Sequence, residues 1–192
     1  MLEFKLTVLA LEKEGNNYGW LPAHETWGAV TELPQKNIFS TVAIGAKTIQ
    51  ITLRKQDVTL DTAVLWGEKQ LFITAVNETG DRHHVVLTAA LIDPVTVTLT
   101  RDTYGTNDLM RQTVTGTETV TFPAYITEKY MGYTKSDPQL ILDTQYVLIC
   151  PKAVTLEPGK TVAVNGKKFT VLVAHELDEH KNEYEAERID EP

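Results

Sequence analysis

Two histidines near the end of the chain come closest to a catalytic motif. The segment His175-Glu-Leu-Asp-Glu-His180 is similar to the helical zinc-binding motif of metalloproteases, in which two histidines four residues apart bind one metal ion. Here the histidines are five residues apart. They would lie about 140° apart around a helix and could not share one ligand face. A zinc hydrolase that uses His175 and His180 is therefore the last of the alternatives for this chain.

The remaining nucleophiles and metal ligands form no recognisable set. The single cysteine, Cys150, lies in the apolar run Val147-Leu-Ile-Cys150, and we interpret it as a buried core residue, with a reactive thiol as the alternative. His83 and His84 adjoin a turn, and a metal site there would need distant ligands that the sequence does not identify. No spacing between the histidines, Cys150 and a serine or aspartate indicates catalysis. The sequence therefore predicts a protein that is not an enzyme and has no cofactor and no metal.

The charge of the chain does not favour tight, sequence-independent binding of nucleic acid. The net charge is −8, and residues 176–192 carry eight acidic and two basic side chains. Binding to the DNA backbone needs a basic cluster that neutralises phosphates. The doublet Lys167-Lys168 adjoins a predicted turn and is interpreted as solvated, so nucleic-acid binding is a minor alternative. An acidic surface can nevertheless line a passage through which DNA slides without sticking.

The sequence predicts no membrane segment. No stretch reaches the roughly 18 consecutive apolar residues of a membrane-spanning helix. The segment Met1-Leu-Glu-Phe-Lys-Leu6 also lacks the basic region and apolar core of a secretion signal. We therefore expect a protein that is intracellular, or packaged from there, and that has no membrane partner.

The elements that carry these residues are predicted to be β-strands that occur in two similar sets. The segment Val154–Val173 contains two short alternating runs around Asn165-Gly166, a dipeptide typical of hairpin turns. The segment Val58–Val76 repeats this pattern in altered form. The order of the predicted elements around the two hairpins matches over nearly the whole chain. We interpret the chain as a duplicated β module.

In the first set, the clearest strand is Thr48–Lys55, because Ile49, Ile51 and Leu53 alternate with polar residues. The other strands predicted for this set are Leu6–Leu11, Trp27–Glu32 and His84–Ile92. Residues 12–17 are expected to end the first of them. Three aromatic residues are expected around the following loop, where they would fill the core or, as a rarer alternative, form a ligand cage. They are Tyr18, Trp20 and Trp27.

In the second set, the predicted strands are Val95–Thr100, Val120–Thr127 and Gln145–Cys150, with a polar stretch at 106–119. From Leu177 onward we expect a short acidic helix or a disordered acidic tail. The sequence thus predicts an all-β fold of two tandem small antiparallel β-barrels with long loops. Their predicted ranges are 1–94 and 95–192, divided at Asp93-Pro94.

These patterns resemble a known family over most of residues 1–175. The first set resembles the head-closure proteins of long-tailed bacteriophages, also called head-tail adaptor or stopper proteins. The second set is similar to related prophage head-closure-like proteins. The segments that carry the resemblance in the first set are Leu6–Leu11, Trp27-Gly-Ala-Val30, Ile49–Arg54, Trp66-Gly67 and Leu71-Phe-Ile73. Those in the second set are Val154-Thr-Leu-Glu-Pro-Gly159, Val162-Ala-Val-Asn-Gly166 and Phe169-Thr-Val171.

The resemblance implies a structural protein at the junction of capsid and tail in the virion, assembled in the host cytoplasm. Proteins of this family form rings, commonly twelve-fold, beneath the portal and adaptor rings, where they retain packaged DNA and dock the tail. The implied partners are other copies in a homo-oligomeric ring, phage portal or adaptor proteins, tail proteins, and double-stranded DNA in passive contact. Family members commonly carry one barrel, so two barrels leave the ring number open.

By position, the resemblance also implies two channel or interface loops, at Leu33–Lys47 and Glu128–Asp143. The candidate residues in them are Pro34, Lys36, Phe39, Lys47, Tyr130, Met131, Tyr133 and Lys135. Exposed aromatic and methionine side chains favour interfaces, although those in the second loop would equally pack under their own barrel. A tail terminator or tail-completion protein and a generic small-barrel binding module are the alternative functions.

Overall fold

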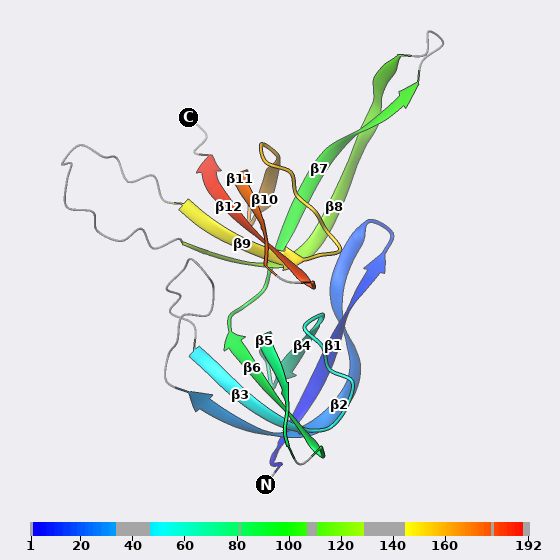
Figure 1. Ribbon diagram of the computed structural model, residues 1–192. Helices are drawn as coiled ribbons and strands as arrows, with labels where there is room; N and C mark the ends of the chain where they lie inside the picture. Colours follow the sequence, from blue (N-terminus) through cyan, green and yellow to red (C-terminus); the bar gives the residue numbers. More distant parts are fainter. Residues whose placement is uncertain are drawn as a thin grey trace, which may run out of the picture.

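The chain forms β-strands throughout the part that the computed structural model describes, residues 2–33, 47–80, 82–106, 111–128, 145–177 and 179–189 (Figure 1). These ranges contain no helix, and hence none with the length and apolarity needed to cross a membrane. The predicted all-β class is confirmed. The strands are β1 (Phe4–Glu14), β2 (Asn17–Leu33), β3 (Lys47–Arg54), β4 (Thr62–Trp66), β5 (Lys69–Glu78), β6 (His84–Leu91), β7 (Val95–Thr106), β8 (Gln112–Glu128), β9 (Gln145–Pro151), β10 (Thr161–Val164), β11 (Lys167–Glu176) and β12 (Lys181–Ile189).

Strands β1 to β6 form a closed antiparallel barrel, which we call the N-terminal unit. Its strands pair in the order β1-β4-β5-β6-β3-β2, and β2 pairs again with β1. Side chains that alternate along each strand fill its interior, and Ile49, Ile51 and Leu53 are buried there as their spacing predicts. Closure gives every strand two neighbours, so the barrel body has no open sheet edge.

Strands β7 to β12 repeat this order of pairings and make up the C-terminal unit. β7 pairs with β10, β10 with β11, β11 with β12, β12 with β9, and β9 with β8, which pairs again with β7. This unit has its own core, in which Phe122, Leu148 and Tyr184 are fully buried. The Tyr184 hydroxyl accepts a 3.0 Å hydrogen bond from the backbone N–H of Leu156. The duplication inferred from the two hairpins is therefore present in the strand pairing.

Both predicted hairpins occur at their turn residues. Asn165 and Gly166 join β10 to β11 with φ angles of 49° and 77°. Positive φ at both central residues is the geometry that matches the twist of the two strands, and Asn-Gly adopts it with little strain. Gly67, with φ 62°, takes the corresponding place between β4 and β5.

The first hairpin of each unit is longer than the sequence pattern predicts. β1 continues to Glu14 and β2 begins at Asn17, so the expected break over residues 12–17 is wrong. Tyr18, Trp20 and Trp27 consequently lie on β2 and not around a loop. Most of the polar stretch 106–119 likewise belongs to β8. A hairpin that extends beyond a barrel body need not show the apolar alternation of a half-buried strand, and these extensions were missed for that reason.

The predicted acidic helix or tail after Leu177 is also wrong, because Lys181–Ile189 forms β12. This strand lies between β11 and β9, and its Tyr184 and Ala186 point into the C-terminal core. Charged residues that would repel one another on a helix alternate along the strand with these buried positions. β12 takes the place that β6 has in the N-terminal unit.

Candidate functional site at the junction of the two units

The two units share an apolar contact, which we call the junction cluster. Phe72 on β5 and Tyr125 on β8 pack with ring centroids 4.6 Å apart and ring planes tilted by 57°. The other buried members are Ala90, Val147 and Ile149. The Tyr125 hydroxyl accepts a 3.1 Å hydrogen bond from the Gln70 amide, and burial raises the pKa of Tyr125. The units are thus joined by packed side chains as well as by residues 92–94.

The junction cluster is made by side chains that face away from the cores of their own units. Leu71 and Ile73 point into the N-terminal core, whereas Phe72 between them points outward and is still only 4% exposed. The sequence signal for this second buried face was an unbroken apolar run, Leu71-Phe-Ile73 in one unit and Val147-Leu-Ile-Cys150 in the other. A strand with only one buried face would instead alternate apolar and polar residues. Such runs indicate that both faces of the strand are buried, but they do not show which element packs on the second face.

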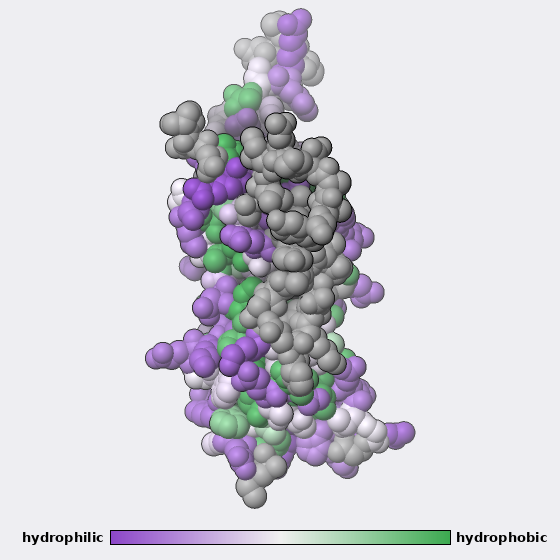
Figure 2. All heavy atoms as spheres, turned by 90° about the vertical axis from the view of Figure 1, so that its left-hand side faces the viewer, coloured by the Kyte–Doolittle hydropathy of each residue, from purple (hydrophilic) through white to green (hydrophobic). Residues whose placement is uncertain are grey.

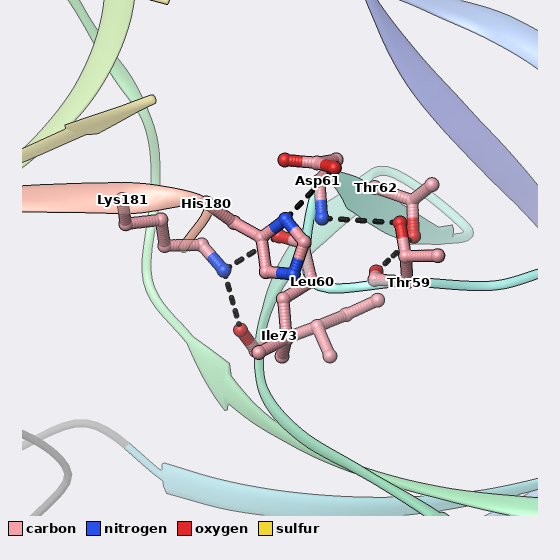
Figure 3. Close-up of polar contacts among 7 residues, drawn as sticks. All are labelled: Thr59, Leu60, Asp61, Thr62, Ile73, His180 and Lys181. Atoms are coloured by element: carbon pink, nitrogen blue, oxygen red, sulfur yellow. Dashed lines mark hydrogen bonds and ion pairs between the residues drawn. The ribbon is translucent and has the colours of Figure 1, made fainter. Parts of the chain in front are cut away.

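A polar contact adjoins the cluster where the start of β12 meets the loop before β4 (Figure 3). The Lys181 Nζ donates hydrogen bonds to the backbone oxygens of Leu60, at 2.6 Å, and Ile73, at 3.2 Å. It also lies 4.8 Å from the centroid of the Phe72 ring. Since Lys181 is 6% exposed, carbonyl dipoles and a ring face replace much of the water around its ammonium group. Next to it, the Nδ1 of His180 lies 2.8 Å from the Oδ2 of Asp61.

The end of the β1–β2 hairpin, residues 11–14 and 17–20, lies against the C-terminal unit, and we call it the first arm. The backbone N–H of Thr121 donates a 3.2 Å hydrogen bond to the oxygen of Asn16, and its hydroxyl donates to the side chain of Asn17. Asn17 and Thr121 form a parallel bridge between β2 and β8. Tyr18 packs against the C-terminal core. The first arm is therefore the third part of the junction.

A cavity of about 290 Å³ lies among these three contacts. Its walls include Trp20 of the first arm, Phe72 and Tyr125 of the junction cluster, and the His180–Asp61 pair. The Trp20 Nε1 is buried and has no hydrogen-bond partner within the described part of the chain. The walls thus offer apolar surface and an imidazole–carboxylate pair. A volume of this size is near the lower limit for small-ligand pockets.

The other candidate chemical groups are separated from one another. Cys150 is a buried core residue, as predicted, and burial raises the pKa of its thiol to about 12, so it is a poor nucleophile near neutral pH. His175 lies on β11 with its Nε2 3.4 Å from Glu185, whereas His180 pairs with Asp61. Among the residues with described positions, no group of three or more His, Cys, Asp or Glu could hold a metal ion.

Most of the predicted loop residues lie outside the described part of the chain. These are Pro34, Lys36, Phe39, Tyr130, Met131, Tyr133 and Lys135. Lys47 is described; it begins β3, and its Nζ lies 3.0 Å from the Oε1 of Glu32 on β2. The two predicted loops start from equivalent strand ends, those of β2–β3 and β8–β9, which Figure 1 shows on the same side of the molecule.

Comparison of the sequence with known protein families found no match, and neither did a search of curated proteins. The resemblance to head-closure proteins is carried by hydrophobic and turn patterns, and it stays a prediction.

Proposed function

We propose that the chain is a structural component of the neck of a tailed phage, a head-completion or stopper protein. In this proposal, copies form a ring between the portal or adaptor and the tail, retain the packaged DNA and dock the tail. The supporting observation is that both units insert a long segment, 34–46 or 129–144, between equivalent strands. Head-closure barrels, which the sequence resembles, carry their channel loop between their second and third strands.

The strand ends give each loop a fixed base. In the N-terminal unit, β2 and β3 pair up to Leu33 and Thr48, and the Lys47–Glu32 ion pair lies beside this last pair. In the C-terminal unit, β8 and β9 pair up to Glu128 and Tyr146. Loops on a rigid scaffold are where proteins commonly place their binding residues. The packed junction holds the two bases in one relative position, so a single chain would present two loops to a channel.

The test is to disrupt the gene in its phage and examine the particles by cryo-electron microscopy. The proposal expects capsids that package DNA but lose it, without attached tails, and rings at the capsid–tail junction of complemented particles. Variants with residues 34–46 or 129–144 replaced by short glycine-serine linkers would separate DNA retention from ring formation.

Two other outcomes would overturn the proposal. DNA-filled capsids together with tails of irregular length would identify a tail terminator instead. Normal particles, combined with salt-sensitive binding of single-stranded DNA by the monomeric protein, would identify a small-barrel binding module.

A further inference from the structure

The far end of the β7–β8 hairpin projects from the molecule as a two-stranded ribbon (Figure 1). We call residues 101–106 and 112–118 the second arm. All of them are exposed except Gly105 and Glu118, which are half-buried. Figure 2 shows this end as a narrow, mostly hydrophilic projection. A two-stranded ribbon with no further support is marginally stable in water, and its edges present unpaired backbone groups, so the second arm is suited to pair with another chain.

Two apolar side chains of the second arm face solvent side by side. Tyr104 and Val114 are direct cross-strand partners, and they are 64% and 56% exposed. At the root of the arm, the Nε of Arg101 lies 2.8 Å from the Oε2 of Glu118, and this hydrogen bond lowers the pKa of the Glu118 carboxyl. Adjoining apolar side chains that face solvent can serve as the apolar part of a protein interaction site.

The duplication shows which part of the first arm corresponds to this pair. Leu6 and Val97 are equivalent, because each pairs with the last residue before a hairpin turn, Trp66 in the N-terminal unit and Val164 in the C-terminal unit. Their partners on the next strand, Thr26 and Phe122, are therefore equivalent as well. When equal numbers of residues are counted outward from these pairs along the strands, the pair Lys13 and Tyr18 is equivalent to the pair Tyr104 and Val114. Both hairpins carry one register shift before these pairs, so the pairing stays equivalent beyond it.

In the first arm, this position is docked on a neighbouring unit. Tyr18 packs against the C-terminal core, and Asn17 pairs with Thr121 of β8. The same counting places Thr113 of the second arm at the position of Asn17. It places Glu25 of the N-terminal unit at the position of Thr121. Glu25 and its ion-pair partner Lys5 are both exposed, with the Lys5 Nζ 2.7 Å from the Glu25 Oε2.

The surface around Glu25 is chemically suited to the second arm. Trp27 lies two residues after Glu25 on the same face of β2 and is 56% exposed. Leu21, which precedes Glu25 in the same strand, is 48% exposed. The corresponding strand surface in the C-terminal unit is the one that receives the first arm. Exposed apolar groups thus occur both on the free arm and on the strand that the repeat assigns as its acceptor.

We propose that the second arm of one copy docks on β2 of the N-terminal unit of a second copy, with Tyr104 and Val114 against Trp27 and the backbone of Thr113 beside Glu25. The contact joins two different surfaces, so repeated contacts either close into a ring or grow into a filament. The register rests on the duplication and the apolar contact on the exposed side chains, and neither depends on the neck function, for which the contact would join neighbouring copies in the ring.

The register is tested by cysteine cross-linking of full-length protein. Glu25→Cys and Thr113→Cys are made as separate variants, mixed, and oxidised with diamide; Cys150 is buried with a thiol pKa of about 12 and should not react. A disulfide-linked dimer that forms in the mixture in large excess over either variant alone supports the proposal. The chain with both Asn17→Cys and Thr121→Cys is the positive control for an intramolecular bond. The proposal is overturned if the mixture gives no disulfide-linked dimer, or if it gives only dimers in which both cysteines are at position 113.

The contact itself is tested by sedimentation of the wild type at about 100 μM, where a micromolar contact is largely occupied. The double variant Tyr104→Ser/Val114→Ser and the acceptor variant Trp27→Ser should each raise the dissociation constant about tenfold or more. The control, Thr103→Ser/Thr115→Ser, alters side chains on the opposite face of the same arm and keeps the hydroxyl that donates from position 115 to the Thr103 oxygen, so it should leave the dissociation constant unchanged. A monomeric wild type, or equal effects of test and control variants, overturns the proposal.

These results separate the docking contact from the neck function. If copies of the Tyr104→Ser/Val114→Ser variant still form rings in particles, the docking contact is wrong while the neck function stands. If the cross-link forms but disruption of the gene leaves DNA retention and tail attachment normal, the contact stands and the neck function falls.

Discussion

Replacing Phe72 with Ala should weaken the fold and also loosen the coupling between the two units. Phe72 is 4% exposed, and its ring contacts Tyr125 of the other unit. The Lys181 ammonium lies over the same ring. The substitution removes a side chain that is buried between the units and not inside one barrel.

The expected loss follows from this burial. Removing a buried phenylalanine side chain costs about 3–5 kcal/mol of unfolding free energy, which includes the cavity that is left. The loss of the aromatic pair and of the cation–π contact is part of this figure and places it toward the upper end. For a chain of this length the melting temperature should fall by roughly 6–20 °C.

Phe169→Ala is the matched control. Phe169 is also 4% exposed, but it lies in the C-terminal core, where its ring packs edge-on against Tyr146 with centroids 5.1 Å apart. Urea unfolding should give similar losses for the two variants. Hydrogen exchange should separate them, since Phe72→Ala should speed exchange in β5 together with β8 and β9, whereas Phe169→Ala should act mainly within β10 to β12.

Two results would refute this reasoning. A loss below about 1 kcal/mol for Phe72→Ala would mean that the ring is not buried as the packing indicates. Faster exchange confined to the N-terminal unit would mean that the junction cluster does not couple the two units.

Three further predictions concern single positions. Gly166→Ala should cost about 1 kcal/mol in urea unfolding, because φ is 77° and a Cβ there would meet nothing within 4 Å, so only backbone strain acts. Gly28→Ala should cost more, about 1–3 kcal/mol, because its Cβ would lie 2.7 Å from side-chain carbons of both Leu6 and Leu53; an equal or smaller loss would contradict the packing argument. The contribution of Cys150 to stability should fall by about 1.4 kcal/mol per pH unit between about pH 9 and pH 12, because the unfolded chain releases the Cys150 proton near its ordinary pKa of 9.0 while the folded chain holds it until about pH 12. This stabilisation is fully present below pH 9, and parallel pH curves for wild type and Cys150→Ala would disprove the assignment.

Local sequence patterns determined the parts of the fold whose signals are local. Alternation predicted the strand around Ile51, and Asn165-Gly166 predicted its hairpin turn, because side-chain period and turn conformation depend on a few adjacent residues. The apolar surroundings of Cys150 likewise predicted its burial. The similar order of elements in the two halves predicted the duplication.

The predictions from sequence were wrong where contacts between distant parts of the chain decide the secondary structure. β12 was missed because an acidic segment with no clear alternation becomes a strand only through its pairing with β9 and β11. Tyr18 and Trp20 were assigned to a loop because their partners belong to the C-terminal unit or line the cavity beside it.

The chemistry-bearing residues illustrate the same division. The spacing of His175 and His180 argued only against a metal shared on one helix face, and His175 lies on a strand. Spacing could not predict that His180 pairs with Asp61 or that Lys181 donates to the carbonyl oxygen of Leu60, because these partners are more than a hundred residues apart in the chain. The sequence by itself determined two sets of strands and their turns. Only the tertiary structure decided that the first arm is docked while its equivalent is exposed, because the first arm packs on the C-terminal unit, whereas nearly all residues in 101–106 and 112–118 face solvent.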